Sequence, residues 1–360
     1  MRYVIDKTRR PAYLQLYKAI RDDIIGGIYP YNAKLPSERT LAEETGLSTI
    51  TVEHAYGLLC DEGYAQSRER SGYYVIFRSS DGFAASSDRY DRVFGQPPAP
   101  PPRPLFPISV LCKTMRKVLG DYYDAILEKT QGTGCAELRG AIRDYLARNR
   151  GIRVCADRIV VGSGAEYLYG LLITMFGKDT VYAVESPSYE KIEKIYFAAG
   201  VKYETLPLTC DGIETNALFA SSADVLHTTP YRSYPSGVTA SASKRHEYIR
   251  WSDEKENRYI IESDYGSEFA VASQPMETLF ALADRDNVIY LNTFARTISP
   301  SLRIGYMVLP ERLVPLFNEK VGFYSCSVPT FEQYVLAELL GGGDFERHIN
   351  RVRRNMRKGS

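Results

Sequence analysis

The sequence predicts an α/β protein in two parts: a small helical module with a β-hairpin, then a larger domain built on a mostly parallel sheet. A proline run, "GQPPAPPPRP", separates them, because neither a helix interior nor a central strand accommodates it. Before it, apolar residues recur at helical spacing; after it, apolar β-branched runs alternate with helical stretches. We therefore expect a first domain over residues 1–76, a linker over 77–104 and a second domain over 105–360.

The composition argues against several classes of protein. The 360 residues are 44% hydrophobic and 25% charged with a formal net charge of +1, so any nucleic-acid-binding face must be local. No apolar run reaches the roughly 18 to 20 residues of a membrane span, and no secretory signal is visible. The six cysteines are scattered and the four histidines lack metal-ligand spacing. We expect free thiols, no metal site, no membrane contact and a cytoplasmic protein.

The segment "AYLQLYKAIRDDIIGG" predicts an amphipathic helix. Leu16, Ile20 and Ile24 share one face, and the two closing glycines end the helix. In "LPSERTLAEETG", Ser37 is a good N-cap, and Gly46 ends a second helix after two turns. These two helices form the beginning of a compact helical module.

A third helix is predicted in "LSTITVEHAYGLLCDEGY", with Ser48 as its N-cap. Its buried stripe is expected to comprise Val52, Ala55, Tyr56 and Leu59. Two short helices joined by a tight turn predict a helix-turn-helix. The alternating segment "YAQSRERSGYYVIF", with Ser71 and Gly72 at its middle, predicts a hairpin, or wing.

This module resembles the winged helix-turn-helix of GntR-type bacterial transcription regulators. The residues that carry the resemblance are Leu35, Pro36, Ser37, Arg39, Leu41, Ala42, Gly46, Leu47, Ser48, Thr51, Val52, Ala55, Tyr56, Leu58, Glu62, Gly63 and Gly72. The resemblance implies that the second helix of the motif enters the major groove of double-stranded operator DNA. The residues then expected at the DNA are Arg39, Ser48, Thr49, Thr51, Ser71 and Gly72.

One departure weakens the expected DNA affinity of a single module. Thr49 stands where the family commonly has an arginine, and residues 1–76 carry equal numbers of basic and acidic side chains. Fewer phosphate contacts mean weaker binding. We therefore expect a homodimer that presents two modules to paired half-sites.

The second domain is expected to hold strands over "RIVVG", "VYAVES", "VLHTTP", "RYIIESDY", "NVIYLNTF" and "RIGYMVLP". Ligands of such sheets bind beyond the carboxyl ends of the strands. In "VVGSGAEYLYGLL", the amides of Gly164, Ala165 and Glu166 begin a helix and could hold a phosphate. Tyr189, in the loop "VESPSYEK", could stack on a flat cofactor, although taken alone a packed tyrosine is the better explanation in a chain with 28 tyrosines.

In order and spacing these features resemble the fold-type-I aminotransferase domain of MocR-type regulators, which is joined to a GntR-type head. "QGTGCAELRGAIRDYL" and "FEQYVLAELLGGGDFERHINRVRRNMR" extend the resemblance from Phe106 almost to the end of the chain. It implies a pyridoxal-phosphate-transferase-like fold, a head-to-tail homodimer and a domain that senses pyridoxal phosphate more than it catalyses. The family continues into a further small domain, so we expect this chain to be shortened at its C-terminus.

The resemblance also implies a set of cofactor contacts. They are Gly164, Ala165, Glu166, Tyr189, Tyr234, Asp264, Thr293, Arg296 and Arg303. Arg296 occupies the position of the Schiff-base lysine, and a guanidinium has no free amine to attack an aldehyde. We therefore expect no enzymatic activity, and pyridoxal phosphate bound noncovalently at best.

Two further positions depart from the family. Ser263, in "ESDY", replaces the carboxylate that pairs with the pyridine nitrogen and gives the ring its electron-accepting character. The adjacent Asp264 could substitute, but strand alternation would direct it to the other face. "RSYPSG" replaces "HQYPTG", which changes the contacts at the ring edge to Arg232, Ser233 and Tyr234.

Three interpretations stay open at this point. The first is a DNA-binding transcription regulator whose aminotransferase-like domain dimerises and senses a small anionic ligand or noncovalent pyridoxal phosphate. The second is a pyridoxal-phosphate-dependent aminotransferase with a regulatory head, which Arg296 and Ser263 oppose. The third is a dimerisation body without any ligand.

Overall fold

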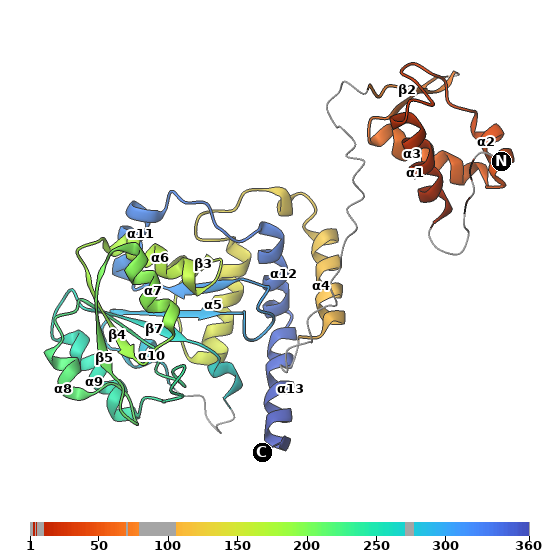
Figure 1. The fold of residues 1–360 in the computed structure, drawn as a ribbon. Helices are drawn as coiled ribbons and strands as arrows, with labels where there is room; N and C mark the ends of the chain where they lie inside the picture. Colours follow the sequence, from red (N-terminus) through yellow and green to blue (C-terminus); the bar gives the residue numbers. More distant parts are fainter. Residues whose placement is uncertain are drawn as a thin grey trace. The chain divides into compact units, whose positions relative to one another are not determined.

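The computed structural model describes residues 3, 5, 11–69, 71–78, 106–270 and 277–359. For residues 358 and 359 it describes the backbone and not the side chains. The chain divides into two compact units, Met1–Pro100 and Pro101–Ser360, and each is described by itself (Figure 1). Nearly all of the predicted linker over 77–104, together with residue 105, lies outside the described residues.

The smaller unit contains three helices and one hairpin among its described residues. They are α1 (Ala12–Ile25), α2 (Glu38–Thr45), α3 (Thr49–Asp61), β1 (Ala65–Arg68) and β2 (Gly72–Val75). The predicted stripes on α1 and α3 are buried and form one apolar core. The predicted caps are confirmed: Ser37 and Ser48 begin α2 and α3, and Gly46 ends α2 in the left-handed conformation.

The larger unit alternates strands and helices over most of its length. Its strands are β3 (Ile159–Gly162), β4 (Val181–Ser186), β5 (Lys202–Pro207), β6 (Val225–Thr228), β7 (Tyr259–Asp264), β8 (Val288–Thr293) and β9 (Gly305–Val308). Its α-helices are α4 (Ile108–Asp121), α5 (Ala136–Arg150), α6 (Ala165–Phe176), α7 (Glu190–Ala199), α8 (Thr215–Ala220), α9 (Ala242–Asp253), α10 (Leu279–Leu282), α11 (Val314–Val321), α12 (Thr330–Gly341) and α13 (Asp344–Gly359). Short 3₁₀ turns are η1 (Ala125–Leu127), η2 (Ala156–Arg158), η3 (Ser267–Phe269) and η4 (Glu311–Leu313).

The seven strands form one sheet in the order β3-β9-β8-β7-β6-β4-β5. The neighbours from β8 through β5 are parallel, whereas β9 runs antiparallel to both β3 and β8. The sequence therefore predicted the mostly parallel sheet correctly. It missed β5, an edge strand whose polar residues give it no apolar run.

Helices cover both faces of the sheet (Figure 1). One face packs against α6, α7 and α11 through residues such as Ile261 and Leu291. The other packs against α5, α9, α12 and α13 through residues such as Ile260 and Tyr290. Adjacent residues of β7 and β8 thus belong to opposite layers, as strand geometry requires.

Three further findings concern the described part of the chain. No helix there is long and apolar enough to cross a membrane. No group of three or more histidine, cysteine or acidic side chains there has positions that could hold a metal ion. All six cysteines are free thiols.

Candidate nucleic-acid interface and ligand pocket

The start of α3 presents three of the predicted DNA contacts. Ser48 Oγ accepts a hydrogen bond from the Thr51 amide at 3.2 Å and lies 2.8 Å from Thr51 Oγ1. These two hydroxyls hold the first turn of α3 in shape. Thr49 beside them is exposed, as is Ile50, which is 64% exposed and was not among the predicted contacts. The first turn of α3 is therefore an ordered, accessible edge.

Arg39 lies on α2, two positions after the capping Ser37. Its side chain is exposed, and it forms no ion pair with any residue that the structure describes. A guanidinium group can engage a phosphate or a guanine edge with two parallel hydrogen bonds. Arg39 is thus available for either contact.

The wing is built around Tyr74. Ser71 Oγ lies 2.8 Å from Tyr74 Oη, and Gly72 adopts a φ of +97° that permits the tight turn. Arg68 stacks on the Tyr74 ring, with its guanidinium carbon 4.3 Å from the ring centroid. Lys34 Nζ lies 6.0 Å from the same centroid. Lys34 was not among the predicted contacts, and only its pairing with Tyr74 across the chain reveals that it flanks the wing.

In the larger unit, four predicted residues surround the start of α6, and we call Gly164, Ala165, Thr293 and Arg303 the phosphate cup. A Cβ on Gly164, whose φ is +90°, would lie 3.4 Å from Arg303 Nη2. A Cβ on Gly305 would lie 3.3 Å from Gly164 Cα and 3.1 Å from Thr293 Cγ2. The start of α6, the end of β8 and the start of β9 therefore meet closely, and only glycines permit it.

Thr293 Oγ1 is buried and has no hydrogen-bond partner among the described residues. Buried hydroxyl groups are nearly always hydrogen-bonded, so an unpartnered one calls for an explanation. The Gly164 amide, which the sequence predicted as a phosphate donor, instead donates to the Gly162 carbonyl oxygen at 2.8 Å. An anion at the start of α6 would accept hydrogen bonds from the Thr293 hydroxyl, from Arg303 and from the Ala165 and Glu166 amides. The residues present therefore fit a phosphate group.

Glu166 contributes more to the cup than the amide that the sequence predicted. Its carboxylate forms ion pairs with Lys191 at 2.7 Å and with Arg303 at 3.3 Å. The hydrogen bond from Lys191 lowers the pKa of Glu166. Glu166 and Lys191 therefore extend the charges at the cup to two cations and one anion, and a bound phosphate would compete with Glu166 for Arg303.

Two tyrosines lie near the cup. Tyr189 is the N-cap residue of α7 and is 41% exposed, and Tyr234 is 65% exposed. Their ring centroids are 6.2 Å apart with the planes at 73°. Lys191 lies between Tyr189 and the cup. Its Nζ is 6.0 Å from the Tyr189 ring centroid and forms an ion pair with Glu166.

Arg296 lies against the end of β7. Its Nη1 donates a hydrogen bond to the Tyr265 carbonyl oxygen at 3.2 Å, and its guanidinium carbon lies 5.3 Å from the Tyr265 ring centroid. A Cβ on Gly266 would lie 2.6 Å from Arg296 Cδ, so this packing requires the glycine. The side chain at the lysine position is thus held by contacts of its own.

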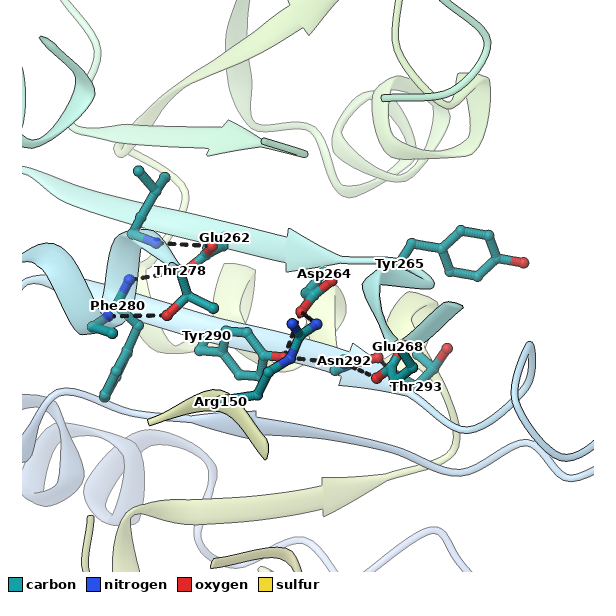
Figure 2. A network of polar contacts seen from close by, with 12 residues as sticks. Arg150, Glu262, Asp264, Tyr265, Glu268, Thr278, Phe280, Tyr290, Asn292 and Thr293 are labelled. Carbon is teal, nitrogen blue, oxygen red and sulfur yellow. Dashed lines mark hydrogen bonds and ion pairs between the residues drawn. The ribbon is translucent and has the colours of Figure 1, made fainter. Parts of the chain in front are cut away.

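Asp264 requires a correction, because it does not lie with the other predicted cofactor contacts. It is buried on the face of β7 that packs against α5, where its Oδ2 accepts hydrogen bonds from Arg150 and, at 2.7 Å, from Tyr290 (Figure 2). Ser263 faces the opposite layer and contacts Tyr169 and His227. Strand alternation separates the two side chains.

Sequence reasoning missed the polar network around Arg150 altogether (Figure 2). Arg150, at the end of α5, is buried among three buried carboxylates. These are Glu262, Asp264 and Glu268. Glu268 Oε1 accepts a hydrogen bond from Asn292 at 2.7 Å, and burial raises the pKa of Glu268. The single guanidinium of Arg150 is therefore the positive charge next to three buried carboxyl groups at the carboxyl ends of β7 and β8.

Glu262 predicts a pH dependence of stability. Burial raises its pKa from 4.5 to about 8, although its carboxyl group accepts hydrogen bonds from the Leu279 and Phe280 amides at 2.9 Å. The native state therefore binds more protons than the unfolded chain between these values. This contribution to stability is complete below pH 4.5 and is lost as the pH rises through about 8.

We expect Glu262→Gln to flatten this decline. Trp251, the single tryptophan of the chain, is buried in the larger unit. Its fluorescence therefore reports the unfolding of that unit. Unfolding midpoints at pH 5, 6.5 and 8 would be compared between the native protein and the variant. Parallel pH profiles would show that Glu262 does not titrate in this range.

Comparisons with known proteins agree with the two-unit architecture. Residues 12–75 match the family "Bacterial regulatory proteins, gntR family", and residues 125–358 match "Aminotransferase class I and II". The chain is 31% identical to an uncharacterized HTH-type transcriptional regulator of Bacillus subtilis, YdeL, over 97% of this chain and 77% of the relative. It is 28% identical to the probable rhizopine catabolism regulatory protein MocR of Rhizobium meliloti, over 96% of this chain and 74% of the relative.

A further relative is the HTH-type pyridoxine biosynthesis transcriptional regulator PdxR of Corynebacterium glutamicum, 28% identical over 94% of this chain and 75% of the relative. Solved aminotransferases share the fold of the larger unit. The kynurenine aminotransferase of Pyrococcus horikoshii superposes with a TM-score of 0.62 at 24% identity, covering 69% of this chain. A multiple substrate aminotransferase of Thermococcus profundus gives 0.63 at 22% identity and the same coverage. The chain spans 64% of the length of each of these enzymes.

Proposed function

The chain belongs to the MocR-type regulators, which join a gntR-family DNA-binding domain to an aminotransferase class I and II domain, and we propose that its second domain senses a phosphate-bearing ring without covalent chemistry. The protein is thus a DNA-binding transcription regulator. We further propose that the ligand binds noncovalently and that the domain does not catalyse transamination. We also propose that the protein is a homodimer and that it is located in the cytoplasm with the DNA.

The buried hydroxyl of Thr293 carries the ligand proposal, because it has no partner among the described residues and because Thr293 and Gly164 both lie beside Gly305. Arg303 adds a guanidinium near Gly164, because a Cβ on Gly164 would lie 3.4 Å from Arg303 Nη2. The helix α6 has 12 residues and starts without a side-chain cap, so its first amides and its dipole favour an anion. A donor, a cation and a helix start together match the phosphate of pyridoxal phosphate.

Arg296 supports binding without catalysis. When bound, pyridoxal phosphate supplies an electrophilic aldehyde and an electron-accepting ring. This chain places a guanidinium where an amine would be needed, and Tyr265 and Gly266 hold it in place. The residues of the pocket would then bind and orient the ring, and the affinity difference between two conformations of the protein would supply the signal.

The proposed homodimer is supported by apolar side chains around α4. Ile108 is 70% exposed, Tyr123 75% and Leu127 86%. Large exposed apolar side chains in one segment are typical of a surface covered by a partner, and paired half-sites call for a second copy of the chain. Sedimentation equilibrium of the purified chain is expected to give the mass of two chains; the mass of one chain would contradict the proposal.

A dimerisation body without a ligand is the second candidate. One observation favours it: Glu166 already pairs with Arg303 and lowers the positive charge of the cup. The aminotransferase alternative is disfavoured by Arg296 and Ser263, which replace the lysine and the carboxylate that the chemistry requires.

Calorimetric titration with pyridoxal 5′-phosphate separates these candidates. We expect heat of binding with the native protein, and complete recovery of the colourless protein after dialysis. Arg303→Ala should bind at least about tenfold more weakly, because a hydrogen bond to a charged group contributes about 1.5 to 3 kcal/mol. Arg143→Ala is the matched control, since Arg143 is an exposed arginine that pairs with its neighbour Asp144.

Absence of heat with the native protein would favour the ligand-free body. Retention of the ligand through dialysis, with visible absorbance on the protein, would contradict noncovalent binding. Equal affinities of Arg303→Ala and Arg143→Ala would place the ligand outside the phosphate cup.

A further inference from the structure

A chain of four hydrogen-bonding side chains crosses the layer between α6, α7 and the sheet. Tyr196 Oη lies 2.8 Å from His227 Nδ1, and His227 Nε2 lies 2.8 Å from Ser263 Oγ. Tyr169 Oη lies 3.0 Å from the same Ser263 oxygen. All four side chains are buried, with Ser263 6% and His227 1% exposed.

Counting donors and acceptors limits where the hydrogens can be. Among the described side chains Tyr196 Oη contacts His227, so donation of the Tyr196 hydrogen to Nδ1 avoids a buried unsatisfied proton. The hydrogen of the neutral imidazole is then on Nε2, which donates to Ser263 Oγ. The contact between Tyr169 Oη and Ser263 Oγ allows either oxygen to donate. The four side chains carry four hydrogens and make three contacts, so one hydrogen has no partner within this network. An acceptor placed beside Ser263 Oγ would let all four hydrogens be donated, with Tyr169 and His227 donating to Ser263.

Among the described residues, the hydrogen-bond partners in this network are neutral side chains. Burial lowers the pKa of His227 to about 3, so the imidazole is neutral at physiological pH. The nearest carboxylates of the strand, on Glu262 and Asp264, face the opposite layer with Arg150. The position where the family carries a carboxylate is here a neutral hydroxyl donor.

The helix α6 relates Ser263 to the phosphate cup through Tyr169. Tyr169, its hydrogen-bond partner, follows Ala165 by four residues on α6 and lies on the same face of that helix. Four residues of α-helix rise about 6 Å, comparable to the reach of a pyridine ring carrying a phosphoester arm. A ring whose phosphate binds at the start of α6 would bring its far edge to Ser263.

We propose that Ser263 determines ligand specificity by donating a hydrogen bond to an uncharged acceptor on the ring, so that the domain selects a neutral, unprotonated ring nitrogen over a pyridinium. This proposal rests on the proposed function, because it concerns the ring of a ligand anchored in the phosphate cup. It differs from the carboxylate–pyridinium pairing that the family implies.

Calorimetry with three probes tests it at one pH: pyridoxal 5′-phosphate, its N-methylated cation, and the analogue with C–H in place of the ring nitrogen. The native protein is expected to bind pyridoxal 5′-phosphate roughly tenfold more tightly than either analogue, because a lost hydrogen bond leaves a buried group unsatisfied. Ser263→Ala should remove the preference over the C–H analogue. Ser263→Asp should shift the preference toward the N-methylated cation.

The outcomes separate the two proposals. If none of the three probes binds the native protein, the proposed function fails and this inference fails with it. If all three bind the native protein with equal affinity, the cup binds a ligand and only the role of Ser263 is overturned. The comparison of probes on the native protein stands even if a variant fails to fold, and Trp251 fluorescence checks the folding of both variants.

Discussion

Replacing Arg150 with alanine is expected to lower the free energy of unfolding of the larger unit by about 3 to 5 kcal/mol. Arg150 is 4% exposed in its side chain and pairs with Asp264, which is 5% exposed. Without the guanidinium, the buried carboxylates of Asp264 and Glu268 lose their compensating charge. Among the described residues, Tyr290 would remain as the one donor to Asp264.

Thermal unfolding followed by Trp251 fluorescence measures this loss, because Trp251 is fully buried in the larger unit. At roughly 2 to 4 °C per kcal/mol for a unit of this size, the midpoint should fall by about 6 to 20 °C. Arg148→Ala is the control on the same helix: Arg148 is 51% exposed and pairs with Glu346, so its loss should cost less than about 1 kcal/mol. Equal midpoints for the two variants would contradict a structural role for Arg150.

Arg39→Ala is expected to weaken binding to specific DNA by about 1 to 3 kcal/mol, which is roughly 5- to 150-fold. Arg39 is exposed on α2 and has no ion pair with any described residue, so alanine removes a contact to DNA without breaking one within the protein. The DNA would be duplexes enriched from a random pool by the native protein. Affinity would be measured by fluorescence anisotropy at fixed salt, because phosphate contacts depend strongly on ionic strength.

Arg21→Ala is the matched control for Arg39, since Arg21 lies on α1 of the same unit and is engaged with Asp22. We expect its affinity to stay close to that of the native protein. If Arg39→Ala binds the enriched duplexes as tightly as Arg21→Ala, then α2 does not contact DNA in the way the family implies.

Much of the fold could be predicted from local signals in the sequence. Ser37, Ser48 and Gly46 mark helix ends through cap chemistry that needs only neighbouring residues. The central strands are apolar runs because both faces of the sheet are covered. The edge strand β5 was missed because most of its side chains are exposed or partly exposed, so Lys202 and Glu204 need not be apolar. The other edge strand, β3, is buried along its whole length and was predicted from its apolar run.

The candidate site was predicted unevenly, and long-range contacts account for the difference. Gly164, Thr293 and Arg303 came from a family resemblance, and the structure brings them together. The partnership of Arg150 with Asp264 joins residues 114 positions apart, and no local pattern announces it. The ion pair between Glu166 and Arg303, 137 positions apart, was missed for the same reason.

The Ser263 network shows the same limit. Sequence reasoning recognised that Ser263 replaces a carboxylate, and strand alternation directed Asp264 away from it. The neutral histidine behind the serine could not be foreseen, because His227 comes from β6 and depends on sheet order and burial. The chemistry of this position is therefore a property of the assembled layer.

The affinity of the protein for its enriched DNA, with and without pyridoxal 5′-phosphate, tests most directly whether the second domain regulates the first. We expect the ligand to change this affinity by about 5- to 150-fold, the usual range of coupling between two sites, and the change to disappear in Arg303→Ala. If pyridoxal 5′-phosphate leaves the DNA affinity of the native protein unchanged at saturating concentration, the second domain is not a sensor of this ligand.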